Sequence, residues 1–234
     1  MPNFPSLVLV HGSWHGPWMW EPLIDALPGV DVHALALPAT GEDPATLGDL
    51  YDDAATVAAA IAAIDGPVVV LGHSSGGIPV TEAATADNVR RLIYLAAFQL
   101  DTGESLFSSV GSTPAPWWRV HEREGLRSKG YVVPLRPEEI FFNDCDPQDA
   151  KRHASRLTLQ SWAAKTQPLT RAAWRSIPST YVVCEADNAI PVFGQEAMAQ
   201  RADKVVRLNA GHDSFLSKPA EVAALIREEL SALV

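Results

Sequence analysis

Basic residues are absent from the first 89 positions of this chain, which hold 11 aspartates and glutamates but no lysine or arginine. The whole chain of 234 residues carries a formal net charge of −10 at pH 7. A surface of this sign repels phosphate backbones and anionic membranes. We therefore expect no nucleic-acid partner and no membrane partner, and we expect the protein to act on a small molecule.

Cysteine is scarce as well, since the chain contains Cys145 and Cys184 and no others. The two stand far apart without a CxxC spacing, so the sequence indicates neither a zinc site nor a disulfide framework. Both are expected to be free thiols, with Cys184 inside a buried strand.

Long apolar runs are also missing. No run approaches the ~18 residues that a membrane-spanning helix needs. The short apolar stretch at residues 7–10 has no basic flank before it, unlike a secretory signal. We therefore expect a cytoplasmic protein.

Short apolar runs alternate with amphipathic segments, and hydrophobic residues make up 47% of the chain. The runs predict six strands, at residues 6–10, 31–37, 67–71, 91–97, 179–184 and 204–208. Helices are expected at residues 17–26, 47–64, 78–86 and 219–233. In the second of these, Thr46 is the expected N-cap, with Asp49 three residues on. This alternation predicts an α/β fold with a mostly parallel six-stranded sheet in the order 2-1-3-4-5-6 and helices on both faces.

Residues 99–177 interrupt the alternation, so the core of this single structural unit would consist of residues 1–98 and 178–234. A connection of this length must carry structure of its own. We expect an inserted helical cap, with helices at residues 137–142 and 146–157. Placed at the carboxyl edge of the sheet, the cap would cover a site there, and its tryptophans would line an apolar pocket for an acyl or alcohol group. Alternatively, these aromatic side chains only pack the cap against the body.

Gly72, Ser74 and Gly76 form a GxSxG motif directly after the third predicted strand. In this motif a sharp strand-to-helix turn lifts the serine hydroxyl above the end of the sheet. Glycine is needed where neighbouring Cβ atoms would collide. The Ser75 amide then lies at the start of a helix, where backbone N–H groups stabilise developing negative charge. A plain glycine-rich turn is the alternative, whereas a phosphate-binding P-loop lacks its lysine here.

His212 and Asp187 are the predicted partners of Ser74, because a serine hydroxyl needs a base, most often a histidine held by a carboxylate. His212 follows the last predicted strand in a glycine-bearing loop, and Asp187 follows the strand before it. All three residues therefore emerge at the same sheet edge. Glu185 is the alternative acid. The other histidines lie in turns or lack such a context: His11, His15, His33, His73, His121 and His153.

With these residues in place, the chain resembles the α/β-hydrolases over its whole length. It is most similar to the small esterase branch that includes plant methylesterases, hydroxynitrile lyases and their bacterial relatives. HGSWHGPW at residues 11–18 resembles the HGAxHGAW opening of that branch, and GHSSGG at residues 72–77 resembles its GHSxGG elbow. Similar too are Asp187 in a DxxxP context and the order serine, aspartate, histidine along the chain.

The resemblance implies a carboxylesterase that cleaves a small, apolar or aromatic ester through an acyl-enzyme. It implies no metal ion and no organic cofactor, and the protein would be a monomer or homodimer. The residues implied are Ser74, His212 and Asp187 for catalysis, the backbone amides of Ser13 and Ser75 for the oxyanion hole, and Trp14, Trp117 and Trp118 for substrate binding.

Two departures from the branch argue against cyanohydrin cleavage. Gly12 stands where the lyases carry threonine, and Asp213 stands where they carry a lysine that stabilises the departing cyanide. Hydrolysis is therefore the better expectation. Two alternatives stay open: a slow or non-catalytic small-molecule binding protein or receptor on the same fold, and a biosynthetic enzyme that cleaves a thioester or lactone.

Overall fold

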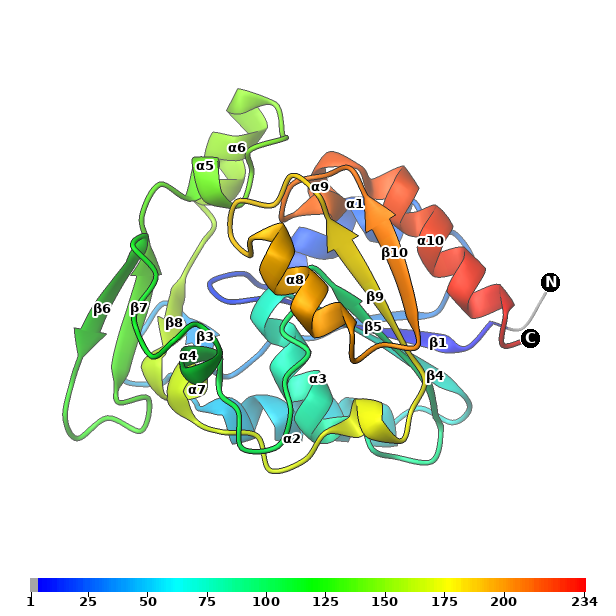
Figure 1. The fold of residues 1–234 in the computed structure, drawn as a ribbon, viewed down its shortest axis with the longest axis horizontal. Helices are drawn as coiled ribbons and strands as arrows, with labels where there is room; N and C mark the ends of the chain where they lie inside the picture. Colours follow the sequence, from blue (N-terminus) through cyan, green and yellow to red (C-terminus); the bar gives the residue numbers. More distant parts are fainter. Residues whose placement is uncertain (1–3) are drawn as a thin grey trace.

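A computed structural model describes residues 4–234, and its larger β-sheet has the strand order β10-β9-β5-β4-β1-β2 (Figure 1). Every neighbouring pair in this sheet is parallel. Numbered along the chain, the order is the predicted 2-1-3-4-5-6, so the predicted sheet is confirmed. Its strands are β1 (Ser6–Val10), β2 (Val32–Ala34), β4 (Val68–His73), β5 (Val89–Leu95), β9 (Ser179–Cys184) and β10 (Lys204–Leu208).

The central strands are the ones whose bounds follow most closely from their apolar runs. Every residue of β4 and β9 is buried, as in a parallel sheet covered on both faces. The edge strand β2 is shorter than predicted, because pairing with β1 involves only three of its residues. Cys184 ends β9 as a buried free thiol, as expected.

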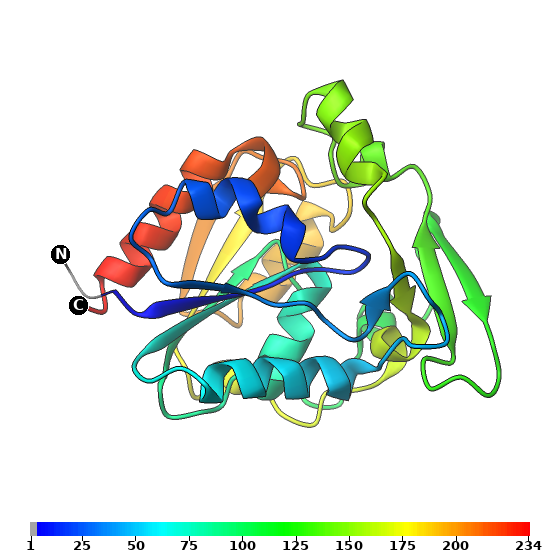
Figure 2. The same cartoon turned by 180° about the vertical axis from the view of Figure 1, so that it is seen from behind.

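Helices cover both faces of the sheet, which is also confirmed (Figure 2). One face carries the 3-10 helix η1 (Pro17–Trp20) with α1 (Glu21–Asp25), α9 (Ser214–Ser217) and α10 (Pro219–Ser231), packed through residues such as Trp20, Phe215 and Ile226. The other carries α2 (Leu50–Ala62), α3 (Gly77–Ala83) and α8 (Val192–Ala199), packed through Val57, Val80 and Ala199. None of the helices in residues 4–234 combines the length and apolar character that a bilayer crossing requires.

The start of α2 differs from the prediction, and the expected Thr46 cap is wrong. The carboxylate of Asp49 accepts hydrogen bonds from the backbone N–H groups of Tyr51 and Asp52, and the side chain of Asp52 accepts from the Asp49 N–H. Thr46 instead donates its hydroxyl to the carbonyl of Asp43. The capping box thus lies three residues later than expected, because a carboxylate is a strong acceptor at the helix start.

Residues 99–177 contain strands as well as the expected short helices. The strands β6 (Trp118–Glu122), β7 (Gly130–Pro134) and β8 (Leu159–Ser161) join the short β3 (Thr40–Gly41) in a second, antiparallel sheet of order β3-β8-β7-β6. The helical turns are α4 (Leu106–Ser109), α5 (Pro137–Ile140), α6 (Pro147–Ala154), α7 (Trp162–Thr166) and η3 (Ala173–Arg175). The sequence analysis expected a purely helical insert and missed these strands.

Backbone hydrogen bonds join this insert to the loops that follow β1 and β2. The Ser161 N–H donates to the carbonyl of Ala39, and the Thr158 N–H donates to the carbonyl of Trp14, both at 2.8 Å. The indole N–H of Trp14 donates in turn to the carbonyl of Val132. In Figure 1 most of the insert, with β6, β7, β8 and the helices α4 to α7, lies to the left of the large sheet.

Candidate functional site

Ser74 stands directly after β4 at a sharply bent backbone position. Its φ angle is 53°, in the left-handed region that few residues other than glycine adopt. The 3-10 helix η2 (Ser74–Gly76) begins there and leads into α3. A Cβ atom at Gly76 would overlap the carbonyl oxygens of His11 and Val10, so only glycine fits, as the GxSxG motif predicts. The bent turn presents the Ser74 hydroxyl at the edge of the sheet.

His212 and Asp187, which lie in the loops after β10 and β9, form a direct hydrogen bond. The distance from His212 Nδ1 to Asp187 Oδ2 is 2.8 Å, and both side chains are buried. The ring of His212 lies 4.5 Å, centroid to centroid, from the ring of His73, the residue before Ser74. The structure thus brings the predicted imidazole and carboxylate together beside the serine turn. The Ser74 hydroxyl itself forms no hydrogen bond with any residue from 4 to 234.

Asp187 is held by four hydrogen bonds. Its Oδ1 atom accepts from the backbone N–H groups of Ala189 and Ile190, and its Oδ2 atom accepts from Gln195 Nε2 as well as from His212. The alternative acid, Glu185, is exposed and pairs with Arg207 at 3.4 Å. Of the two candidate carboxylates, the one that contacts His212 is therefore Asp187.

The charge of Asp187 affects the protonation of His212. Burial alone lowers the pKa of the His212 imidazole, but the negative charge and hydrogen bond of Asp187 more than offset this effect, so the pKa lies above its ordinary value. His212 Nδ1 is occupied by Asp187, so Nε2 is the nitrogen left for other partners. This arrangement suits a base that accepts and returns a proton through Nε2.

The histidines near the turn have structural partners. His11 donates through Nδ1 to the carbonyl of Gly12 and accepts the Leu37 N–H at Nε2, and burial lowers its pKa to about 4. His73 donates through Nε2 to the carbonyl of His212. Burial, followed by the effect of His212, lowers the pKa of His73. Both rings are held by hydrogen bonds to the backbone, and their lowered pKa values disfavour a role as the base for Ser74.

A second buried histidine–carboxylate pair lies next to the first. His15 Nε2 lies 2.9 Å from Asp213 Oδ2, and His15 Nδ1 lies 2.7 Å from the carbonyl oxygen of Ser13. Both nitrogens of His15 therefore face oxygen atoms, one on Asp213 and one on the loop that carries Ser13. These two contacts tie that loop to Asp213.

The loop after β1 and the start of η2 present the two predicted oxyanion donors. The Ser13 N–H donates to no residue among positions 4–234. Ser75 lies in the first turn of η2, where backbone N–H groups lack partners within the helix. The hydroxyls of these two serines are hydrogen-bonded to each other at 2.7 Å. Both residues therefore face the same space.

A small cavity of about 50 Å³ opens beside Ser74. Trp14, Trp117 and Trp118 all line it, so the structure places the three predicted aromatic residues at the serine. The ring centroid of Trp14 lies 5.6 Å from that of Trp117 and 6.4 Å from that of Trp118, in edge-to-face geometry. They form one apolar wall.

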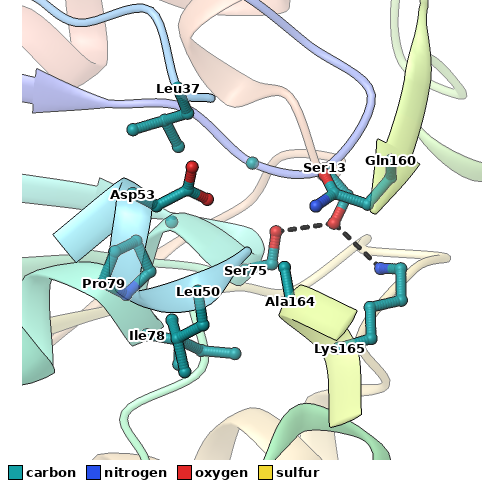
Figure 3. A pocket seen from close by; sticks show the side chains of 12 residues that line it. Ser13, Leu37, Leu50, Asp53, Ser75, Ile78, Pro79, Gln160, Ala164 and Lys165 are labelled. Carbon is teal, nitrogen blue, oxygen red and sulfur yellow. Dashed lines mark hydrogen bonds between the residues drawn. The ribbon is translucent and has the colours of Figure 1, made fainter. Parts of the chain in front are cut away.

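Lys165 on α7 also lines this cavity, and the sequence analysis missed it. Its ammonium nitrogen lies 2.9 Å from Ser13 Oγ, which is in turn bonded to Ser75 Oγ (Figure 3). Gln195, which holds Asp187, was also missed. No local pattern identifies either residue, because a lysine or glutamine in an amphipathic segment is normally exposed.

One cluster within residues 4–234 has the spacing of a metal site, formed by His73, His212 and Asp213. Two of its members have hydrogen-bond partners among the described residues: His212 Nδ1 contacts Asp187, and His73 Nε2 donates to the carbonyl of His212. The arrangement around Ser74 is instead one of nucleophile, imidazole and carboxylate.

Comparison with known proteins gives a consistent picture. The family model described as "Alpha/beta hydrolase family" matches residues 7–225. An "Alpha/beta hydrolase nvfD" of Aspergillus novofumigatus is 30% identical, with 95% of each chain covered. "Methylesterase 7" of Arabidopsis thaliana is 26% identical, covering 97% of this chain and 96% of the relative. The crystal structure of polyneuridine aldehyde esterase superposes with a TM-score of 0.78 at 25% identity, covering 97% of this chain and 99% of the other.

Proposed function

This chain belongs to the alpha/beta hydrolase family, in the small esterase branch that resemblance predicted, and from that premise we propose that Ser74, His212 and Asp187 hydrolyse a carboxylic ester through an acyl-enzyme. The observation that supports this proposal best is the 2.8 Å hydrogen bond between His212 and Asp187 beside the bent Ser74 turn. Esterases and hydrolases among its relatives support the same reaction class.

In the proposed mechanism, Ser74 Oγ attacks the ester carbonyl carbon while His212 Nε2 accepts the hydroxyl proton. Asp187 orients the ring and stabilises the imidazolium that forms. His212 then donates this proton to the departing alcohol, which leaves an acyl group on Ser74. A water molecule, deprotonated by His212, attacks the acyl carbon and releases the carboxylic acid, and Ser74 recovers its proton.

The negative charge on the carbonyl oxygen during each attack would be bound by the amides of Ser13 and Ser75. One such donor lowers a barrier by roughly 3 kcal/mol. His15 contacts both Asp213 and the Ser13 carbonyl, which keeps the neighbouring amides in place. The wall of Trp14, Trp117 and Trp118 favours a small apolar or aromatic group on the substrate.

The test is the Ser74→Ala variant, assayed with a short p-nitrophenyl ester. We expect kcat to fall by at least about 10³-fold, because the nucleophile is lost while the fold is kept. Ser231→Ala, which changes an exposed serine at the end of α10, is the matched control and should keep full activity. Equal rates for Ser74→Ala and the native protein would refute the proposal.

A fluorophosphonate probe tests the nucleophile independently of substrate choice. It should label the native protein at Ser74 and leave Ser74→Ala unlabelled. Absence of labelling, together with tight binding of a small ligand, would support the binding-protein alternative instead.

A further inference from the structure

Lys165 is a buried lysine without a carboxylate partner. Its side chain is 2% exposed, and among residues 4–234 no aspartate or glutamate oxygen lies within 4.0 Å of its nitrogen. Burial lowers the pKa of Lys165 to about 7. A buried amine of this kind is costly for the folded state unless a charge or hydrogen-bond partner compensates it.

The contacts of Lys165 leave much of its bonding capacity unused. The nitrogen donates to Ser13 Oγ at 2.9 Å, although an ammonium has three N–H groups. It also lies 4.3 Å from the ring centre of Trp14 and 4.4 Å from that of Trp118, so two indole faces stabilise its positive charge. The indole N–H of Trp118 is itself buried and has no partner among the described residues.

Lys165 lies where a substrate of Ser74 would be bound. It lines the cavity that contains Ser74, Trp14 and Trp118, and Figure 3 shows its side chain directed toward Ser13 and Ser75. A largely apolar pocket with a few convergent polar groups, here Lys165 and the serines, is the usual arrangement for fixing a ligand's orientation.

We propose that the Lys165 ammonium binds a carboxylate on the substrate, so that the preferred esters carry an acid group in addition to the ester that is cleaved. This inference rests on the proposed esterase function and names its substrate class. A carboxylate would supply the missing counter-charge and accept hydrogen bonds from the ammonium and from the free indole N–H of Trp118. The tryptophan walls would exclude water from the pair and so strengthen it.

Asp53 does not supply the counter-charge. It lies on α2 and lines a smaller cavity that also borders Lys165 (Figure 3). Burial raises the pKa of Asp53 to about 8, so its carboxyl group is mostly neutral at pH 7. It is the one other ionisable residue among those lining the two cavities that Lys165 borders.

Matched pairs of methyl esters test the proposal. Each pair compares a monomethyl ester of succinate, glutarate or adipate with the methyl ester in which a methyl group replaces the free acid. Acetoxyacetate against ethyl acetate tests an acid group on the alcohol side. We expect at least one acid ester to have a kcat/KM about tenfold or more above its neutral partner. If no acid ester is preferred, the proposal is wrong.

Lys165→Met retains most of the side-chain volume and removes the charge. It should reduce the ratio of acid-ester to neutral-ester kcat/KM by about 30-fold or more, because a buried charge loses its partner. Lys151→Met, at an exposed lysine of α6, is the matched control and should keep the native ratio. If Lys165→Met slows both esters equally, Lys165 only supports Ser13 and Ser75, and the proposal fails.

The native protein offers a further readout that does not depend on a variant folding. The acid-ester preference should decrease about tenfold per pH unit above pH 7, as free Lys165 loses its proton. Protonation of His212 affects both esters and cancels in the ratio, whereas loss of the Asp53 proton would add to the decrease above about pH 8. Pentanoate should likewise inhibit more strongly than the neutral pentanamide at about pH 6. An acid-ester preference that stays constant with pH, together with equal inhibition by the two compounds, would overturn the proposal. Ser74-dependent cleavage of neutral esters tests the esterase function separately.

Discussion

His212 determines the pH range in which the proposed reaction can run, because the imidazole must be neutral to accept the Ser74 proton. Asp187 holds the pKa of His212 above its ordinary value of 6.5. We therefore expect kcat/KM for a neutral ester to fall as the pH decreases through a midpoint above 6.5. A pH–rate profile measures this midpoint, and Asp187→Asn should shift it downward and reduce the rate. A midpoint below about pH 6 in the native protein would contradict His212 as the base.

Gly12 lies so close to Ser74 that a side chain there requires either the serine turn or the loop after β1 to shift. A Cβ atom at Gly12 would lie 2.7 Å from Ser74 Cβ. We expect Gly12→Ala to reduce kcat for a short ester by about tenfold or more, since small displacements of reacting groups are costly. The matched control is Gly194→Ala in α8, where the added Cβ meets only Ile190 at 3.9 Å. Native kcat in Gly12→Ala would show that the turn tolerates a displacement.

Single site residues could be predicted from the sequence where they lie in loops that follow predicted strands. The residues that support them could not. Ser74, Asp187 and His212 each follow a strand of the parallel sheet, so their convergence at one edge could be predicted from chain order. Lys165 and Gln195 could not be predicted, because only the packing of the insert and of α8 makes them buried.

The α2 helix shows how a local signal can be assigned to the wrong residue. Asp49 accepts two backbone hydrogen bonds at its start, whereas Thr46 bonds to the loop before it. We expect Asp49→Ala to lower the free energy of unfolding by ~1 kcal/mol, as the loss of an N-cap usually does. Thr46→Ala should change it by less than ~0.5 kcal/mol. Urea unfolding measures both, and a larger effect at Thr46 would restore the original assignment.

Elements of the large sheet were predictable because their apolar runs are buried on both faces, while the strands of the insert were not. β6 has the sequence WRVHE, in which apolar and polar residues alternate on a partly exposed sheet. Its partner β7 lies beyond a loop, and β8 lies about 25 residues farther along the chain. Pairing over such distances depends on tertiary contacts that a local pattern does not contain.

The net charge of −10 affects any acidic substrate before it reaches Lys165. Long-range repulsion slows the approach of an anion, and added salt screens it over about 10 Å at 0.1 M. The buried contact with Lys165 is screened much less. We therefore expect kcat/KM for an acid ester to rise about two- to threefold between about 20 and 200 mM NaCl, with no change for its neutral partner. Steady-state assays check this, and a decrease for the acid ester would show that local attraction dominates.

β3 belongs to the body and precedes the serine in the chain, whereas β8 belongs to the insert. Their pairing therefore fastens the insert to the body. Rotating the insert away as a rigid body would break the ladder between Thr40 and Gln160 as well as the bond from Ser161 to Ala39. At the rim of the cavity Val110 is exposed and Trp117 is half-buried, and their side chains can change rotamer without breaking this ladder. We therefore expect ligands to enter past these two side chains.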